Sequence, residues 1–260
     1  MGMQGKKGAS YQAPAVEKAL DVLEFLAEQP DGAMMKDITA GLGRSMSEIY
    51  RMVLALENRR FVHKDPESER YYLSLRLFEL AHRHPPVARL VRFAHPVMEG
   101  LGQRSMQSCH LAITEMDRLV ILATADSPTA MHYGVKVGSS FPLLETSSGA
   151  VITAFAHESR QQTVLRGLDE GTKRSLKRRF QKIRREGGEI RRSDVVEGVT
   201  NISFAVRELS GHAVAALTVP YLKQTRAMPG EEEIAAMTRD AALELSAALG
   251  HKVENTQDDD

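Results

Sequence analysis

Residues 35–61, MKDITAGLGRSMSEIYRMVLALENRRF, decide the fold of the first part of this chain. They predict two short helices joined by a turn that contains glycine, and the second helix begins at a capping box. Ser45 and Glu48 have the S-x-x-E spacing, in which each side chain satisfies a free backbone N–H at the helix start. Apolar residues then recur at i, i+4 and i+7, which predicts one buried face and one polar face. The apolar residues at these positions are Ile49, Val53 and Leu56.

The polar face of the second helix indicates a function. A short helix, a tight turn and a second helix with a polar outer side are typical of a helix-turn-helix, which places its second helix in the major groove of DNA. Arg51 suits a guanine or a phosphate, Ser47 is short and tolerates any base, and Tyr50 reaches a phosphate or a thymine methyl. Tyr50 and Met46 could instead pack against the hairpin that follows, and for Met46 packing is the favoured prediction.

Residues on both sides of this helix complete the predicted DNA surface. Lys36 and Thr39, at the start of the preceding helix, are expected to contact phosphates, although Thr39 could equally be an ordinary helix-surface residue. Two basic side chains of the hairpin are expected to touch the DNA backbone or the minor groove. The predicted DNA-binding residues are Lys36, Thr39, Arg44, Ser45, Ser47, Tyr50, Arg51, Lys64 and Arg70.

Charge alone identifies no partner. The net charge is zero, and basic and acidic side chains balance in residues 1–84, so the strongly basic domain usual for a DNA-binding protein is absent. Residues 44–64 have a local excess of basic side chains. Phosphate neutralisation is therefore expected to come from this segment, doubled by dimerisation.

The pattern along the chain predicts two modules. A helix that starts near Pro14 is expected to bury Val16, Leu20, Leu23 and Ala27, and the segments FVHKD and RYYLS are expected to pair as a hairpin around a polar turn. Three helices and a hairpin form a winged helix-turn-helix. The predicted boundaries are a disordered tail at 1–13, the winged helix-turn-helix at 14–73, a linker helix at 74–84, an effector-binding domain at 85–252 and a disordered tail at 253–260.

The second module is predicted to be an α+β domain. The order of a long helix, strands, helices, strands and a last helix suits one domain with a curved antiparallel sheet. Three early strands form an expected meander, and two late strands share a hairpin turn at Ser210–Gly211. The expected strands are CHLAITEM (109–116), RLVILATAD (118–126), MHYGVKVG (131–138), TNISFAVREL (200–209) and HAVAALTVPYL (212–222).

In order and spacing, several segments resemble the IclR family of transcription regulators over nearly the whole chain. The resemblance implies a winged-helix DNA reader joined by a helix to a GAF-like α/β effector domain. It also implies a homodimer or a dimer of dimers on a palindromic double-stranded operator, near genes for the catabolism of small organic acids or aromatic compounds. The segments are AVEKALDVLEFLAEQPDG (15–32), ITAGLGRSMSEIYRMVLALENRRFV (38–62), YYLSLRLFELA (71–81), VKVGSSFPLLETSSGAVITAF (135–155), REGGEIRRSDVVEGVTNISFAV (185–206) and GHAVAALTVP (211–220).

The effector site is expected at the helix that starts in ETSSGAV. A helix N-terminus offers free N–H groups to an anion, and Gly149 lets a ligand approach its backbone, although Ser147 could be a plain N-cap. The resemblance implies that this helix start and the late strands line a pocket for a small organic acid. The predicted effector-binding residues are Met131, Leu143, Ser147, Ser148, Gly149, Ala150, Asn201, Ser203 and Thr218.

Two basic features leave alternatives open. Arg191 or Arg192 stands where the family commonly has an acidic residue, which could favour a larger or more acidic effector or could be a solvated surface charge. The segment 173–192 is rich in lysine and arginine, and its helical phase indicates a solvated face first and a second DNA or partner contact second.

An enzyme with an N-terminal winged-helix dimerisation or recruitment domain is the alternative function. It would need a nucleophile–base pair, a metal set or a cofactor loop, and no recognisable spacing of that kind occurs. Cys109 and His110 are adjacent on an expected strand and so point to opposite faces, which argues against a shared metal. We therefore expect no catalytic residue, metal or cofactor. The single cysteine favours a reducing cytoplasm, and no apolar run reaches the length of a membrane span.

Overall fold

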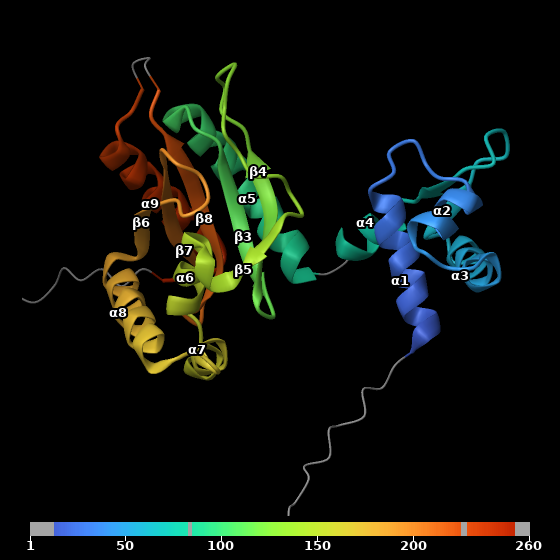
Figure 1. Cartoon of the computed structure of the whole chain (residues 1–260). Coiled ribbons are helices and arrows are strands. Elements are labelled where there is room, and N and C mark those ends of the chain that lie inside the picture. Colours follow the sequence, from blue (N-terminus) through green and yellow to red (C-terminus); the bar gives the residue numbers. More distant parts are fainter. Residues whose placement is uncertain (1–12, 83–84, 225–227, 253–260) are drawn as a thin grey trace, which may run out of the picture. The chain divides into compact units, whose positions relative to one another are not determined.

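The computed structural model describes residues 13–82, 85–224 and 228–252 (Figure 1). The chain forms two compact units, which are residues 1–88 and residues 89–260. The α+β class is confirmed, because the first unit is built around helices and the second around a six-stranded antiparallel sheet. The tails predicted at 1–13 and 253–260 lie outside the described residues, apart from Ala13.

The N-terminal unit is the winged helix-turn-helix that the sequence predicts. A bridge between Ala33 and Tyr71 adds a third short partner to the two-stranded wing. The core lies between the three helices and the wing, around Ile38, Ile49 and Val53. Its elements are α1 (Pro14–Ala27), α2 (Met35–Gly41), α3 (Met46–Asn58), β1 (Val62–Lys64) and β2 (Tyr71–Leu73).

The predicted buried face of α1 is only partly right, since Leu23 packs against the core but Val16 and Leu20 do not. Val16 and Leu20 are 58% and 52% exposed within the chain, whereas Val22 and Leu26 are buried. The helix carries apolar side chains on two sides, so a period of three to four residues can be drawn through either side. Packing against α2 and α3 selects the side of Val22, and a second apolar stripe is left outside.

Gly41, the last residue of α2, allows close packing of α1. A Cβ atom at this position would lie 2.2 Å from the Phe25 ring. Gly41→Ala is therefore expected to destabilise the N-terminal unit by about 1–3 kcal/mol, since the ring must leave its place. Chemical denaturation followed by circular dichroism measures this change. Adding Phe25→Leu to Gly41→Ala should recover part of the lost stability. If the single and the double variant lost the same stability, the contact between position 41 and the Phe25 ring would not be the cause.

Helix α4 lies within the predicted linker at 74–84. It begins at Arg76, two residues after the predicted start, and is described as far as His82, because residues 83 and 84 lie outside the described part. The next helix, α5, begins at Pro85, where prolines suit a first helical turn. The division between the two compact units falls after Ala88, inside α5.

The C-terminal unit is built on one antiparallel sheet with the strand order β5-β4-β3-β8-β7-β6. The strand and helix bounds are α5 (Pro85–Ser105), β3 (Cys109–Glu115), β4 (Arg118–Ala125), β5 (Ser140–Pro142), the 3₁₀ turn η1 (Leu143–Glu145), α6 (Ser147–Ala154), α7 (Glu158–Leu165), α8 (Glu170–Glu186), β6 (Gly188–Arg192), β7 (Val199–Arg207), β8 (Ala213–Leu222) and α9 (Glu231–Ala248). The hairpin turn predicted at Ser210–Gly211 joins β7 to β8.

Helices cover both faces of this sheet (Figure 1). On one face, α5 and α9 pack against strand residues such as Leu111 and Leu217. On the other face, α6 and α8 bury a second cluster that includes Ala112, Ala216 and Phe180. The second face is the important one for function, because α6 begins there above the central strands. None of the described helices has the length and apolar character needed to cross a bilayer.

Three elements differ from the prediction. Residues 131–138, expected as a strand, form an irregular segment, and the third strand of the meander is β5. Side chains in this segment do alternate between inside and outside, although no strand forms. Tyr133 and Val135 line a cavity, while Met131 and Val137 are exposed. Helix α7 and strand β6 were not predicted, because their short polar sequences carry little periodic signal.

Candidate DNA interface and effector pocket

Helix α3 begins as predicted. The Ser45 N–H donates to Glu48 Oε2 at 3.2 Å and the Ser45 hydroxyl donates to the same oxygen at 2.8 Å, so the capping box is present. Ile49, Val53 and Leu56 are its buried residues, which confirms the predicted inner face. The outer face of α3 is therefore fixed in orientation by its first turn and by the core beneath it.

Glu48 also ties α3 to α1. Lys18 Nζ lies 2.6 Å from Glu48 Oε1. The hydrogen bond from Lys18, followed by the hydroxyl and backbone of Ser45, lowers the pKa of Glu48 to about 2. This carboxylate is thus ionised, but the charge of Lys18 balances it, so it adds little negative potential to the outer face.

The pKa of Glu48 gives a pH-dependent prediction for stability. A carboxyl with a lowered pKa stabilises the fold above its ordinary pKa of 4.5, and this contribution is lost as the pH falls toward 2. Glu48→Gln should lower the melting temperature of the N-terminal unit at pH 6, and the difference from the unmodified chain should shrink between pH 4.5 and 2. Melting curves at pH 6 and pH 3 test this; a gap that is equal at both values would contradict the role of the charge.

The outer face of α3 presents side chains that are free to contact a partner. Ser47 and Arg51 are exposed, and Met46 and Tyr50 are 50% and 51% exposed. The favoured packing of Met46 against the wing stays a prediction, and half of this side chain is open to a partner. Within the described residues, Arg51 has no hydrogen bond or ion pair of its own, so its guanidinium is available.

The other predicted DNA contacts differ in their availability. Lys36 is exposed at the start of α2, and the Thr39 hydroxyl donates to its carbonyl at 2.9 Å. Arg44 is partly exposed, with its guanidinium 3.8 Å from Asp21. In the wing, two basic side chains already have partners inside the unit. Lys64 pairs with Glu69, whose carboxylate raises the pKa of Lys64, and Arg70 donates to the Gly32 carbonyl at 3.0 Å.

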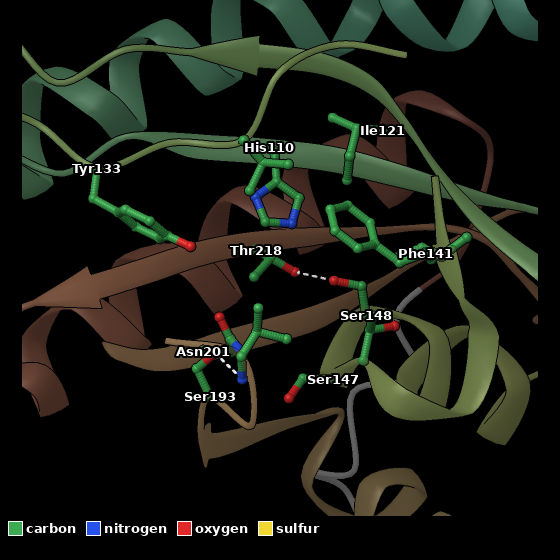
Figure 2. Close-up of a pocket in the computed structure, with 13 residues that line it drawn as sticks. His110, Ile121, Tyr133, Phe141, Ser147, Ser148, Ser193, Asn201 and Thr218 are labelled. Atoms are coloured by element: carbon green, nitrogen blue, oxygen red, sulfur yellow. Dashed lines mark hydrogen bonds between the residues drawn. The ribbon is translucent and has the colours of Figure 1, made fainter. Parts of the chain in front are cut away.

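A cavity of about 80 Å³ lies between the start of α6 and the central strands of the C-terminal unit (Figure 2). The side chains that line it are apolar or uncharged polar ones, with one histidine. The full lining is His110, Leu119, Ile121, Tyr133, Val135, Phe141, Thr146, Ser147, Ser148, Ser193, Val195, Asn201 and Thr218.

The register of three central strands places polar residues side by side at the floor of this cavity. His110 on β3 is paired with Thr218 on β8, and Thr218 is paired with Ser203 on β7. Thr218 donates its hydroxyl proton to Ser203 at 2.9 Å, so the Ser148 hydroxyl, 2.8 Å away, donates to Thr218. A chain of hydroxyls therefore links α6 to β7 through β8.

The N-terminus of α6 faces the cavity but is partly satisfied within the chain. Thr146 is the N-cap, and its hydroxyl accepts the Gly149 N–H at 3.0 Å. Ser147 is therefore the first helical residue rather than the cap. Gly149 packs against the 3₁₀ turn, since a Cβ atom there would lie 1.9 Å from the Leu143 carbonyl oxygen.

His110 is the titratable group at the cavity floor. Its side chain is almost wholly buried, and its Nδ1 has no hydrogen-bond partner among the described residues. Burial lowers the pKa of His110 to about 4, so the imidazole is neutral near pH 7. Cys109, the preceding residue, lies on the opposite face against α5, which confirms that the two side chains diverge.

A second, larger hollow of about 640 Å³ lies beside α7 and is lined by Leu143 among others. Size alone would favour it as a ligand site. The smaller cavity has the stronger case, because polar groups from α6, β3, β7 and β8 converge there and one of them lacks a partner. Among the described residues, no group of His, Cys, Asp or Glu side chains is placed to hold a metal ion.

Comparison with known families decides the identity. Residues 86–247 match the bacterial transcriptional regulator IclR C-terminal domain, and residues 15–66 match the IclR helix-turn-helix domain. The chain belongs to the IclR family. The resemblance seen in the sequence is thereby confirmed, and so is a ligand-responsive DNA-binding regulator as the function class.

Similar proteins extend over nearly the whole chain. The HTH-type transcriptional regulator KdgR of Escherichia coli K12 is 25% identical over 247 residues, which cover 91% of this chain and 93% of KdgR. The HTH-type transcriptional repressor AllR of the same strain is 23% identical over 261 residues, 96% of this chain and 95% of AllR. An IclR homolog from Microbacterium hydrocarbonoxydans, crystallised with 4-hydroxybenzoate, has a TM-score of 0.75 at 23% identity and covers 91% of this chain and 99% of that chain. At this identity the structural likeness concerns the fold.

The cavity of this IclR-family chain brings together only part of the predicted effector set. Ser147, Ser148, Asn201 and Thr218 line it. Ser203 accepts the last hydrogen bond of the hydroxyl chain, from Thr218, and is not part of the lining. Three other predicted residues are buried outside the lining. Those three are Leu143, Gly149 and Ala150, and the ninth predicted residue, Met131, is 82% exposed and outside the lining.

Sequence reasoning missed His110, Tyr133 and Phe141 as lining residues. The alternation in residues 131–138 was a usable signal for Tyr133, but it was assigned to a strand. His110 was considered only as a metal ligand together with Cys109, and that role was excluded. Arg191, considered as a residue that could favour a larger or more acidic effector, is outside the lining and lies 2.9 Å from Asp194, which fits a surface charge.

Proposed function

We propose that this chain binds a palindromic double-stranded operator as a homodimer or a dimer of dimers, and that a small organic acid in the α6 cavity changes this binding. The observation that carries the proposal is the exposed polar face of α3 around Ser47 and Arg51, on a winged helix-turn-helix unit. The regulated genes are proposed to be a catabolic operon, as the catabolic setting of the family suggests. The place of action is proposed to be the cytoplasm.

The proposed DNA surface consists of α3, the start of α2 and the wing. The primary contacts are Ser45, Ser47, Tyr50 and Arg51, supported by Lys36, Thr39 and Arg44. Lys64 can rotate away from Glu69 to reach a phosphate. Arg70 is more suited to holding the loop before α2, because its guanidinium bonds to the Gly32 carbonyl.

Dimerisation is supported by the second apolar stripe of α1. Val16 and Leu20 are more than half exposed within the chain, and a second copy would cover them. A two-fold pair of α3 helices would then meet two half-sites about one helical turn, or a multiple of it, apart. The proposed ligand response is a shift between arrangements of the two DNA-binding units, acting through α4.

The enzyme alternative finds little support in the cavity. In the described part of the chain, no hydrogen bond joins His110 to Ser147 or Ser148, and the Ser148 hydroxyl donates to Thr218. A serine nucleophile would need its proton directed to a base. We therefore propose a binding pocket without catalysis.

The test combines operator selection with a ligand screen. Full-length protein is used to select duplexes from fragmented genomic DNA, and the affinity for the selected duplex is measured by fluorescence anisotropy. Small carboxylates that raise the melting temperature of the protein are then added. A selected palindrome whose affinity changes at least about fivefold with such a ligand is expected, which is the lower end of typical allosteric coupling. Failure to select any duplex, or the same affinity with every stabilising ligand, would contradict the proposal.

A further inference from the structure

In the described part of the chain, His110 is the lining residue that has a fully buried polar side-chain atom without a partner. Figure 2 shows its ring between Tyr133 and Phe141, above Thr218. The side chain is 6% exposed, and no described residue bonds to Nδ1. Buried polar atoms nearly always have a partner, so an unpartnered imidazole at a cavity wall points to a ligand group that completes it.

The hydroxyls around His110 are directed elsewhere. The Ser148 proton goes to Thr218 and the Thr218 proton goes to Ser203, so neither hydroxyl donates to the imidazole. The Thr146 hydroxyl donates to the Leu143 carbonyl and accepts from Gly149. The hydroxyls of Ser148, Thr218 and Thr146 are thus satisfied within the chain, whereas the fully buried Nδ1 of His110 is open to a ligand.

No charged side chain faces His110 across the cavity. Tyr133 is the only other titratable group in the lining. The charged side chains of the neighbouring elements lie outside the lining. They are Glu115 on β3, Arg118 on β4, Glu145 on η1, Arg207 on β7, Lys136 on the covering segment, and the pairs Asp126–His132, Arg179–Glu189 and Arg191–Asp194.

We propose that His110 binds the carboxyl group of the effector and that one proton enters the cavity with it. This inference rests on the proposed function, because it concerns the ligand of the same cavity. The carboxylate arrives from water without a proton, the imidazole takes one proton from solvent, and the two meet as a charge-assisted N–H···O pair. No covalent bond is formed or broken, and the complex holds one more proton than its separate partners.

The charge balance of the cavity favours this proton. A carboxylate buried among uncharged side chains, with no lysine or arginine in the lining, would lose its hydration without a compensating charge. Only the imidazole can supply a positive charge near neutral pH. Its pKa, lowered by burial in the free protein, rises again beside a carboxylate.

The cavity also limits the class of acid. One imidazolium balances one negative charge, so a monocarboxylate fits and a phosphate dianion does not. The centres of water-sized molecules have about 80 Å³ available in the cavity, so a small molecule fits and a large one does not. Phe141, Leu119 and Ile121 form an apolar wall for the rest of it. The effector class is therefore a small monocarboxylic acid with an apolar body.

Benzoate binding to the full-length chain tests the inference, with benzamide as the neutral counterpart. Isothermal titration at pH 5.5, 6.5 and 7.5, in buffers of different ionisation enthalpy, counts the protons taken up. A benzoate carboxyl with an ordinary pKa of about 4 is ionised throughout this range. The dissociation constant is expected to rise about tenfold for each pH unit, as linkage requires for one proton. Benzamide is expected to bind at least about tenfold more weakly at pH 5.5.

Two variants separate His110 from other histidines. His110→Gln keeps a polar side chain but takes up no proton, so the pH dependence should disappear. His132→Gln removes an exposed histidine near the same segment and should retain the full pH dependence. Should His110→Gln fail to fold, labelled histidine in the unmodified chain gives the second measurement: the His110 imidazole should be protonated in the benzoate complex at pH 6.5 and neutral without it.

Several results would overturn the inference. They are benzoate binding without proton uptake, an unchanged pH dependence in His110→Gln, a neutral His110 in the complex, equal binding of benzamide, or no benzoate binding at any of the three pH values. Operator selection uses no benzoate, so its outcome judges the proposed function separately.

Discussion

Arg51→Ala is expected to weaken operator binding by about tenfold to a hundredfold while both units stay folded. Arg51 lies on the exposed face of α3 with no ion pair of its own in the described chain. An arginine that bonds a guanine or a phosphate from a recognition helix contributes about 1–3 kcal/mol, and each 1.4 kcal/mol is a factor of ten. Fluorescence anisotropy with the selected duplex measures the change.

The salt dependence of the same variant shows which contact is lost. If Arg51 neutralises a phosphate, the slope of log affinity against log salt should fall by about one for each copy bound; a lost base contact should instead relax the sequence preference. Arg166→Ala is the matched control, because it removes the same charge from an exposed position in the C-terminal unit. Equal losses in the two variants, or no loss in Arg51→Ala, would contradict the placement of α3 in the groove.

Gly149→Ala is expected to destabilise the C-terminal unit by about 2–3 kcal/mol. The new Cβ atom would lie 1.9 Å from the Leu143 carbonyl oxygen and 2.8 Å from its carbonyl carbon. Both are backbone atoms, so a side-chain rotation cannot relieve the overlap, and α6 or η1 must move. Every residue of α6 is buried, so the shift should reach the effector cavity.

Gly100→Ala is the matched control within a helix. Its new Cβ atom would meet only the flexible end of Arg104, at 3.2 Å, and alanine favours a helix over glycine by about 0.5–1 kcal/mol. Chemical denaturation monitored by hydrogen exchange reports the stability of each unit separately. The N-terminal unit should keep its protection from exchange in both variants. If the C-terminal unit were as stable in Gly149→Ala as in Gly100→Ala, the close contact with Leu143 could not be what requires glycine at position 149.

The role of Gly149 also shows where sequence reasoning stopped. The sequence indicated a position without a side chain at a helix start, and a close ligand was the available explanation. The structure assigns the close approach to Leu143, six residues earlier, because η1 folds back on α6. The local sequence indicates that this position needs glycine, but it does not identify the neighbouring atoms that leave no room for a side chain.

Helix α3 could be predicted because its signals are local. The Ser45–Glu48 box, the buried stripe that follows it and the polar outer face all lie within fourteen residues, 45–58. The inner face of α1 was only partly predicted. Val16 and Leu20 compete with Val22 and Leu26, and only the packing of other helices decides between the two sides.

The effector cavity could be predicted only in part. Ser147 and Ser148 belong to one helix start, which sequence can mark as polar and close to a pocket. His110 reaches the same cavity because β3 pairs with β8 and places it beside Thr218, more than a hundred residues later. Strand order and register are set by the whole sheet, so this neighbour relation has no local signature.

A cleavage experiment on the selected operator tests the central claim, that the outer face of α3 enters the major groove. The single native cysteine does not interfere, since Cys109 is buried and burial raises the pKa of its thiol to about 12. An iron chelate is attached to Ser47→Cys on α3 and, as the control, to Ser159→Cys on α7. The predicted result is cleavage from position 47 in two clusters about one helical turn, or a multiple of it, apart, with little from position 159. Uniform cleavage, or equal patterns from both positions, would contradict it.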